Sequence, residues 1–158
     1  MPEYSTGVKM LRTKYEPQNI ALFVDGPNML RKEFSIDLRE LKKRTSKYCR
    51  IVIAKVFVNQ FAPEKLIEAI INEGFEPKIV LGTKNEEHSD VDVSLAVEAM
   101  EAILTKDIDI IAIATRDADF LQLIQKAKEY GKKVIVFGAE PGFSSSLKNS
   151  ADVVELLS

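Results

Sequence analysis

The chain has 158 residues, of which 46% are hydrophobic and 29% are charged, and its formal net charge is −2. This length and composition are typical of one globular domain with a substantial core. No apolar run reaches the roughly 18 residues that a membrane span requires, the N-terminus lacks a signal-peptide pattern, and the single cysteine excludes an internal disulfide. We therefore expect a cytoplasmic protein with no membrane partner.

Residues 1–18 are polar and lack clear periodicity, so we expect an N-terminal arm that is extended or poorly ordered, followed by one domain over residues 19–158. In that domain, apolar runs of strand length alternate with segments of helical spacing. The first predicted elements are a strand at Ile20–Val24, a helix at Ile36–Tyr48, a strand at Ile51–Val58, a helix at Pro63–Asn72 and a strand at Lys78–Leu81. The later elements are a helix at Asp90–Leu104, a strand at Ile108–Ala114, a helix at Asp119–Tyr130, a strand at Lys133–Phe137, a short helix at Ser144–Asn149 and an edge strand at Val153–Leu156.

This alternation predicts the α/β class, with right-handed crossovers between parallel strands. The expected architecture is a three-layer α/β/α domain around a central parallel sheet of five to six strands. The pattern does not determine the strand order. In the order 3-2-1-4-5, which is usual for such folds, strands one and four are neighbours and their carboxyl ends open a crevice where ligands bind.

Carboxylates occur where this crevice is expected. Asp25 comes directly after the first predicted strand, and Asp117 and Asp119 follow the fourth. On a helical wheel, Asp92 lies on the apolar face of its helix and Asp90 lies on the polar face. An aspartate that faces the sheet is unfavourable unless another group binds it. Strands one and four as neighbours would thus bring four acids together.

Each acid also has a purely structural interpretation. Asp25 could cap a turn, and Asp117 or Asp119 could cap the helix that follows. Asp92 lies three residues after Ser89, which is the spacing of a capping box. These interpretations do not account for the occurrence of all the acids at one edge of the sheet.

Carboxylates that are packed together repel one another unless a cation neutralises them. Oxygen ligands without cysteine favour a hard ion, Mg²⁺ or Mn²⁺, over zinc. Such an ion would support hydrolysis of phosphodiester bonds, because it activates water and neutralises charge on the phosphate. His88 lies in a predicted polar loop, and we interpret it as a surface residue rather than a catalytic base.

Five short motifs occur in order along the chain. They are Asp25-Gly26-Pro27-Asn28, Val91-Asp92-Val93-Ser94-Leu95-Ala96, Thr115-Arg116-Asp117-Ala118-Asp119-Phe120, Gly131-Lys132-Lys133-Val134 and Ser144-x-x-Leu147-x-x-x-Ala151-Asp152. Together they resemble the NYN family of PIN-like domains, which includes the LabA-like proteins, and the similarity covers roughly Asn19–Leu157. The resemblance implies a PIN-like fold with the strand order 3-2-1-4-5.

The resemblance also implies a metal-dependent ribonuclease, most specifically an endoribonuclease, that acts on RNA with Mg²⁺ or Mn²⁺. The residues expected to be catalytic and to bind the metal are Asp25, Asp92, Asp117 and Asp119. The chain departs from the family pattern at Arg116, where glycine is common. It departs again at Ser89-Asp90, which adds a carboxylate and removes a lysine.

Five residues are predicted to contact substrate. Asn28 lies beside the first acid, and Arg31 and Lys32 come shortly after the same loop. Arg116 could hold a phosphate bidentately, or it could crowd the site and alter activity. Ser144 opens a helix whose N–H groups could hold phosphate, although capping explains this serine equally well.

The charge is distributed unevenly along the chain. Residues 1–50 hold 11 Lys and Arg residues against 6 Asp and Glu residues, whereas the remainder holds 11 against 18. The basic residues of the helix predicted at Ile36–Tyr48 either meet a polyanion such as RNA or form an ordinary solvated face.

Other functions are compatible with the same residues. The main alternative to a ribonuclease is a catalytically weak or inactive PIN-like module with an RNA-binding or regulatory role. A Toprim-like metal domain fits less well, because that fold has a glutamate after its first strand where this chain has Asp25. A phosphoaspartate receiver or a phosphatase fits less well still, because Asp25 lacks a second acid two residues later. The oligomeric state is open, with a homodimer as one option.

Overall fold

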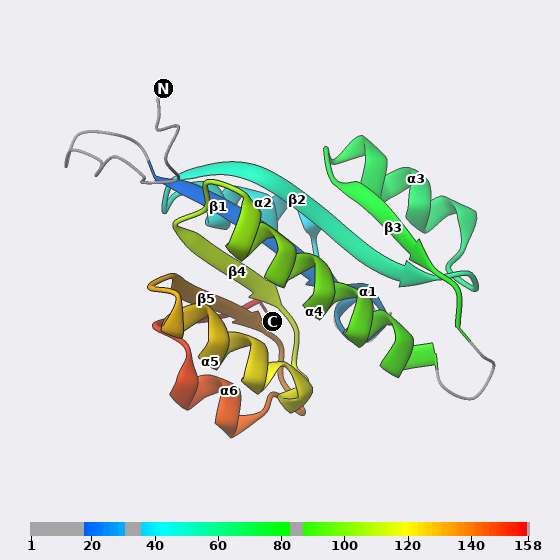
Figure 1. The fold of residues 1–158 in the computed structure, drawn as a ribbon. Coiled ribbons are helices and arrows are strands. Elements are labelled where there is room, and N and C mark those ends of the chain that lie inside the picture. Colours follow the sequence, from blue (N-terminus) through cyan, green and yellow to red (C-terminus); the bar gives the residue numbers. More distant parts are fainter. Residues whose placement is uncertain (1–17, 31–35, 83–86, 158) are drawn as a thin grey trace.

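A parallel sheet of six strands runs through the centre of the molecule (Figure 1). The computed structural model describes residues 18–30, 36–82 and 87–157, so most of the predicted arm, Arg31 and Lys32, and the side chains of residues 87–89 lie outside the described residues. The strands are β1 (Asn19–Asp25), β2 (Arg50–Asn59), β3 (Glu76–Val80), β4 (Ile110–Ala114), β5 (Lys133–Gly138) and β6 (Val153–Leu156). Their order, β3-β2-β1-β4-β5-β6, confirms the predicted order and adds β6 at the edge.

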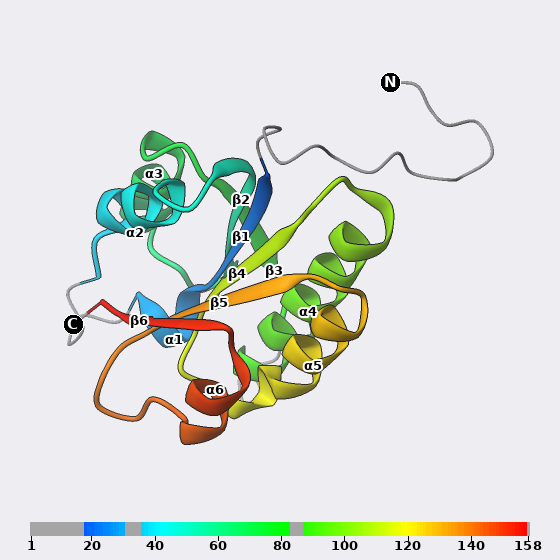
Figure 2. The same ribbon diagram turned by 90° about the vertical axis from the view of Figure 1, so that its left-hand side faces the viewer.

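Helices cover both faces of the sheet, which confirms the predicted three-layer α/β class (Figure 2). One face carries α1 (Gly26–Met29), α2 (Leu38–Ser46) and α3 (Glu64–Asn72), and the other carries α4 (Glu87–Thr105), α5 (Leu121–Glu129) and α6 (Ser145–Ser150). Each face has its own apolar core, because successive strand residues point to opposite sides. Phe23 of β1 packs on the α4 side, and Leu22 packs on the α2 side. Among the described helices, none has the length and apolar character of a membrane span.

Some element boundaries differ from the prediction. β3 begins at Glu76 and includes Pro77, which an edge strand tolerates because it pairs on one side only. The helix predicted over Asp119–Tyr130 is divided into a short 3-10 helix, η2 (Ala118–Phe120), and α5. The single-turn helix α1 was not predicted, because four residues are too few to show a periodic pattern.

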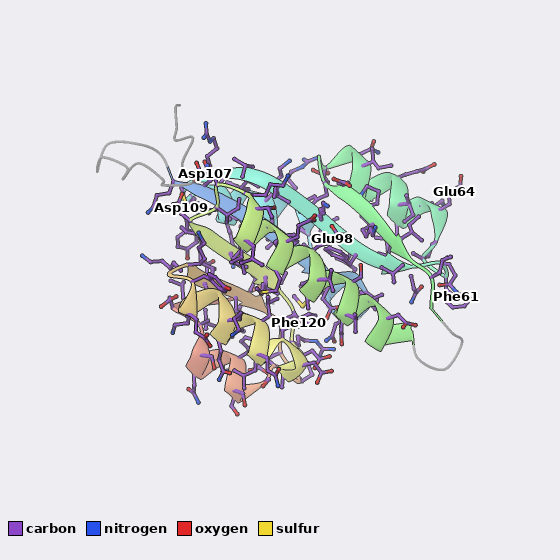
Figure 3. All side chains as sticks on the ribbon, in the orientation of Figure 1. Phe61, Glu64, Glu98, Asp107, Asp109 and Phe120 are labelled. Carbon is purple, nitrogen blue, oxygen red and sulfur yellow. The ribbon has the colours of Figure 1, made fainter. Side chains whose placement is uncertain are left out.

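Apolar packing and a charged contact together hold α4 against the sheet. Leu95 and Ala99 of α4 are fully buried. Glu98 points toward β2 and β3, where its carboxylate lies 2.5 Å from Lys55 Nζ and 3.4 Å from Lys78 Nζ (Figure 3). Burial alone would raise the pKa of Glu98, but the two lysines outweigh burial and lower it. These contacts determine which residues of α4 face the sheet.

Gly26 lies where the end of β1 passes close to β2. A Cβ atom on Gly26 would lie 2.3 Å from the Phe57 carbonyl oxygen and 2.8 Å from Val58 Cγ1. Any larger residue here must displace the backbone of β2, so the second position of the Asp25-Gly26-Pro27-Asn28 motif requires glycine.

We expect Gly26→Ala to lower the free energy of unfolding by about 1–3 kcal/mol, because the added methyl group overpacks a backbone contact. Urea denaturation monitored by circular dichroism measures the change. Gly131→Asn is the matched control, because Gly131 has a φ of 78°, which asparagine tolerates, and its Cβ would meet nothing within 4 Å. Equal stability of Gly26→Ala and the wild type would contradict the steric explanation.

Candidate metal centre

β1 and β4 are neighbours, so the residues at their carboxyl ends lie side by side. Asp25 is the last residue of β1, is 1% exposed, and accepts a hydrogen bond on Oδ2 from Thr115 Oγ1 at 2.9 Å. The Thr115 hydroxyl also accepts a hydrogen bond from the Asp117 N–H at 3.1 Å. Thr115 was not among the predicted site residues, although its position directly after a buried strand beside β1 was a usable signal.

Three further carboxylates lie together at this edge of the sheet. Asp92 on α4, Asp117 before η2 and Asp119 within η2 each offer one oxygen, and these oxygens all lie within 4.8 Å of one another. Asp92 and Asp117 are partly buried, whereas Asp119 is exposed. Asp25 is close enough for its charge to raise the pKa of Asp92. The structure therefore brings Asp92, Asp117 and Asp119 together, as predicted, and links the buried Asp25 to Asp117 through the Thr115 hydroxyl.

The orientation of α4 agrees with the helical-wheel prediction for Asp92. Asp92 is partly buried toward the other acids, whereas the Asp90 carboxylate is directed at Gly82. A cavity of about 230 Å³ adjoins the acids and is lined by Asp92, Val93, Ala96, Asp119 and Phe120. Phe120 lies between α4 and α5 (Figure 3). One wall of the site is therefore apolar.

Asp117 caps the helix that follows it, as its structural interpretation predicted. This cap leaves the Asp117 carboxylate available for another contact. Its Oδ1 accepts a hydrogen bond from the Asp119 N–H at 2.9 Å and so caps η2. A carboxylate has two oxygens and several lone pairs, so one capping bond does not prevent a further interaction. The cap also orients the Asp117 side chain relative to Asp119.

Burial and mutual repulsion raise the pKa of two of the acids. Burial raises the pKa of Asp25 to about 6, although hydrogen bonds from Thr115 and Asn28 oppose the shift. Burial raises the pKa of Asp92 to about 8, with further contributions from the charges of Asp25 and Asp117. A cation among these oxygens would relieve the repulsion, and an all-oxygen donor set fits a hard divalent ion.

Three of the residues predicted to contact substrate have intramolecular partners. Arg116 Nη2 donates to Asn28 Oδ1 at 2.9 Å, and Arg116 Nη1 donates to the Pro141 carbonyl oxygen. Ser144 Oγ accepts a hydrogen bond from the Ser146 N–H at 3.2 Å, as the capping interpretation proposed. A role of these residues in substrate binding stays a prediction.

The basic helix α2 lies away from the acids. Arg39 pairs with Glu73 at 3.2 Å, and Lys42 donates to the carbonyl oxygens at the end of α3. Arg44 contacts the Glu40 and Glu155 carboxylates at 3.0 and 3.6 Å. A cavity of about 670 Å³ lies beside this helix at the amino-terminal edge of β2 and is lined by Arg39, Lys42, Lys43, Ser46, Cys49, Arg50, Ile51 and Glu73. Arg39, Lys42 and Arg44 are therefore engaged with the chain itself.

Comparisons with known proteins agree with this architecture. The crystal structure of VPA0982, a protein of unknown function from Vibrio parahaemolyticus, superposes with a TM-score of 0.80 over 94% of this chain and 97% of that chain. Its sequence identity is 21%, so this likeness concerns the fold. The uncharacterized protein MJ0482 of Methanocaldococcus jannaschii is 57% identical over 143 residues, and the match spans 90% of this chain and 57% of that relative. The NYN domain family matches residues 19–157, and the chain belongs to that family.

Proposed function

We propose that this chain is a metal-dependent ribonuclease that hydrolyses the phosphodiester bonds of RNA with Mg²⁺ or Mn²⁺. The observation that carries the proposal is the convergence of Asp92, Asp117 and Asp119, whose oxygens lie within 4.8 Å of one another beside the buried Asp25. Repulsion among these groups is best relieved by a cation. Membership of the NYN family supports RNA as the class of substrate.

In this proposal Asp92, Asp117 and Asp119 hold the ion through carboxylate oxygens. When bound, a divalent ion would lower the pKa of a water ligand and neutralise charge that develops on the phosphate. Asp25 contributes negative charge from a fixed position, because Thr115 donates a hydrogen bond to its buried carboxylate. The buried Phe120 forms an apolar wall on one side of the acids, and electrostatic interactions are stronger beside such a wall than in open water.

The exposure of the site favours cleavage within an RNA strand. Asp119 is exposed at the surface, and α4 presents Val93 beside it with 62% of its surface accessible. A continuous strand could therefore approach the acids from solvent without threading an end into the protein. We infer that the activity is endonucleolytic.

The raised pKa values predict how the metal-free protein responds to pH. Asp25 and Asp92 have pKa values of about 6 and about 8 in the folded chain, above their ordinary value of 3.8. The folded state therefore binds these protons more tightly than the unfolded state. Their contribution to stability is complete below about pH 4 and is lost as the pH rises through about 6 and then about 8.

We expect the metal-free protein to melt at a lower temperature at about pH 9 than at about pH 5, by about 2–4 °C for each kcal/mol lost. Mn²⁺ should raise the melting temperature more at the higher pH, because the ligands must be deprotonated to bind it. Asp92→Asn should diminish both effects. Differential scanning calorimetry measures them, and the absence of any Mn²⁺ response at either pH would contradict the metal site.

We expect the purified protein to linearise a circular single-stranded RNA in the presence of Mg²⁺ or Mn²⁺, because a circle has no end for an exonuclease. Asp25→Asn, Asp92→Asn and Asp117→Asn should each slow cleavage by roughly 10²–10³-fold, since each removes negative charge that holds the ion. Gel electrophoresis of the labelled circle measures the rate.

Asp90→Asn is the matched control for this experiment, because it makes the same change two residues away on α4 with a side chain directed at Gly82. Its cleavage rate should stay close to that of the wild type. Wild-type rates in the Asp25 and Asp92 variants would rule out the assigned site. Retention of the RNA without cleavage under both metals would instead select an inactive RNA-binding module.

A further inference from the structure

The carboxamide of Asn28 lies between a cation and a buried carboxylate. Its Oδ1 accepts a hydrogen bond from Arg116 Nη2 at 2.9 Å, and its side chain lies close enough to Asp25 to lower the pKa of that carboxyl. A guanidinium can only donate, and an ionised carboxylate can only accept. The carboxamide satisfies both neighbours in one orientation alone, with its oxygen toward Arg116 and its NH₂ group toward Asp25. The reversed orientation would oppose donors at one end and acceptors at the other.

Arg116 is itself fixed by the segment between β5 and α6. Its Nη1 donates to the Pro141 carbonyl oxygen, and its own carbonyl oxygen accepts from the Ser144 N–H at 3.3 Å. A Cβ atom on Gly142 would lie 2.8 Å from Arg116 Nη1, so the backbone of this segment packs closely against the guanidinium. Both terminal nitrogens of Arg116 therefore donate to acceptors of the chain, one of which is Asn28.

We propose that Arg116 is a positioning residue that selects the orientation of the Asn28 carboxamide and thereby the donor that faces Asp25. A glycine, which is common at this position in similar motifs, would make neither side-chain contact. Because a guanidinium stays protonated in proteins, the selection operates at every working pH. In this role the terminal nitrogens of Arg116 face the protein, whereas phosphate binding would require them to face the substrate.

Removal of the Arg116 side chain has two consequences, one for the orientation of Asn28 and one for metal binding. The Asn28 carboxamide loses one of the two neighbours that fix its orientation, and this consequence is independent of any activity. Asp25 then loses a fixed donor beside the metal ligands, and such supporting contacts typically change metal affinity by about 10–100-fold. The second consequence rests on the function proposed above.

The orientation is tested in the metal-free protein by nuclear magnetic resonance of the side-chain NH₂ groups, with Asn28→Ala identifying the Asn28 signals. We expect hydrogen exchange of the Asn28 NH₂ group to be about tenfold faster in Arg116→Ala, which corresponds to the loss of about one hydrogen bond. Arg116→Lys keeps the charge and the aliphatic stem but cannot bridge both acceptors, so it should change exchange in the same direction. Lys126→Ala, which breaks an ion pair with Glu129 on α5, should leave the signals unchanged.

Exchange within about twofold of the wild type in both Arg116 variants would overturn the proposal, and the lysine variant keeps the test decisive should the alanine variant fail to fold.

Calorimetric titration with Mn²⁺ tests whether Arg116 acts through Asn28. Arg116→Ala and Asn28→Ala should each weaken binding by about tenfold, and the double variant should be no weaker than either single variant. Losses that multiply in the double variant would overturn the route through Asn28. A wild type that binds no Mn²⁺ would defeat the proposed function, whereas the exchange measurement would still decide the positioning role.

Discussion

Repulsion among carboxylates at the carboxyl edge of β1 and β4 is the constraint on which the rest of this structure depends. Two unit charges 4 Å apart near a protein surface repel by about 4 kcal/mol, and each acid of the cluster faces more than one other. The hydrogen bond from Thr115 to Asp25 contributes about 1.5–3 kcal/mol, which is less than this summed repulsion. Protons or a cation must supply the remainder. The fold has to hold the acids in place whether they bind protons or a cation.

The scaffold meets this demand by distributing the acids over elements that are each anchored separately. Asp25 ends a strand that is buried on both faces, and Asp117 is tied to the neighbouring strand through the Thr115 hydroxyl. Asp92 is carried by α4, whose rotation is set by Leu95 in the core and by Glu98 against the lysines of β2 and β3. The repulsion is shared among several elements, and Asp25, Asp92 and Asp117 are restrained by contacts outside the cluster.

Periodicity and chain connectivity were sufficient to predict the parallel sheet, whereas the convergence of the acids also depended on the strand order, which the family resemblance implied. Apolar runs such as Ile108–Ala114 revealed the buried strands, and the apolar face of the helix around Asp92 revealed its inward direction. The contacts of Arg116 were beyond prediction, because the segment after β5 reaches it only in three dimensions. The contact of Thr115 with Asp25 was also missed, although the position of Thr115 directly after the strand beside β1 was a usable signal.

Pro77 in β3 also affects how this edge of the sheet can pair with other chains. β3 and β6 are the two outer strands of the sheet, and an outer strand is where another polypeptide can add by backbone pairing. Pro77 has no N–H to donate to an added strand, and the flanking Glu76 and Lys78 are exposed and charged. On the opposite side, β6 has only four residues. Both margins of the sheet thus resist the edge-to-edge growth that leads to aggregation.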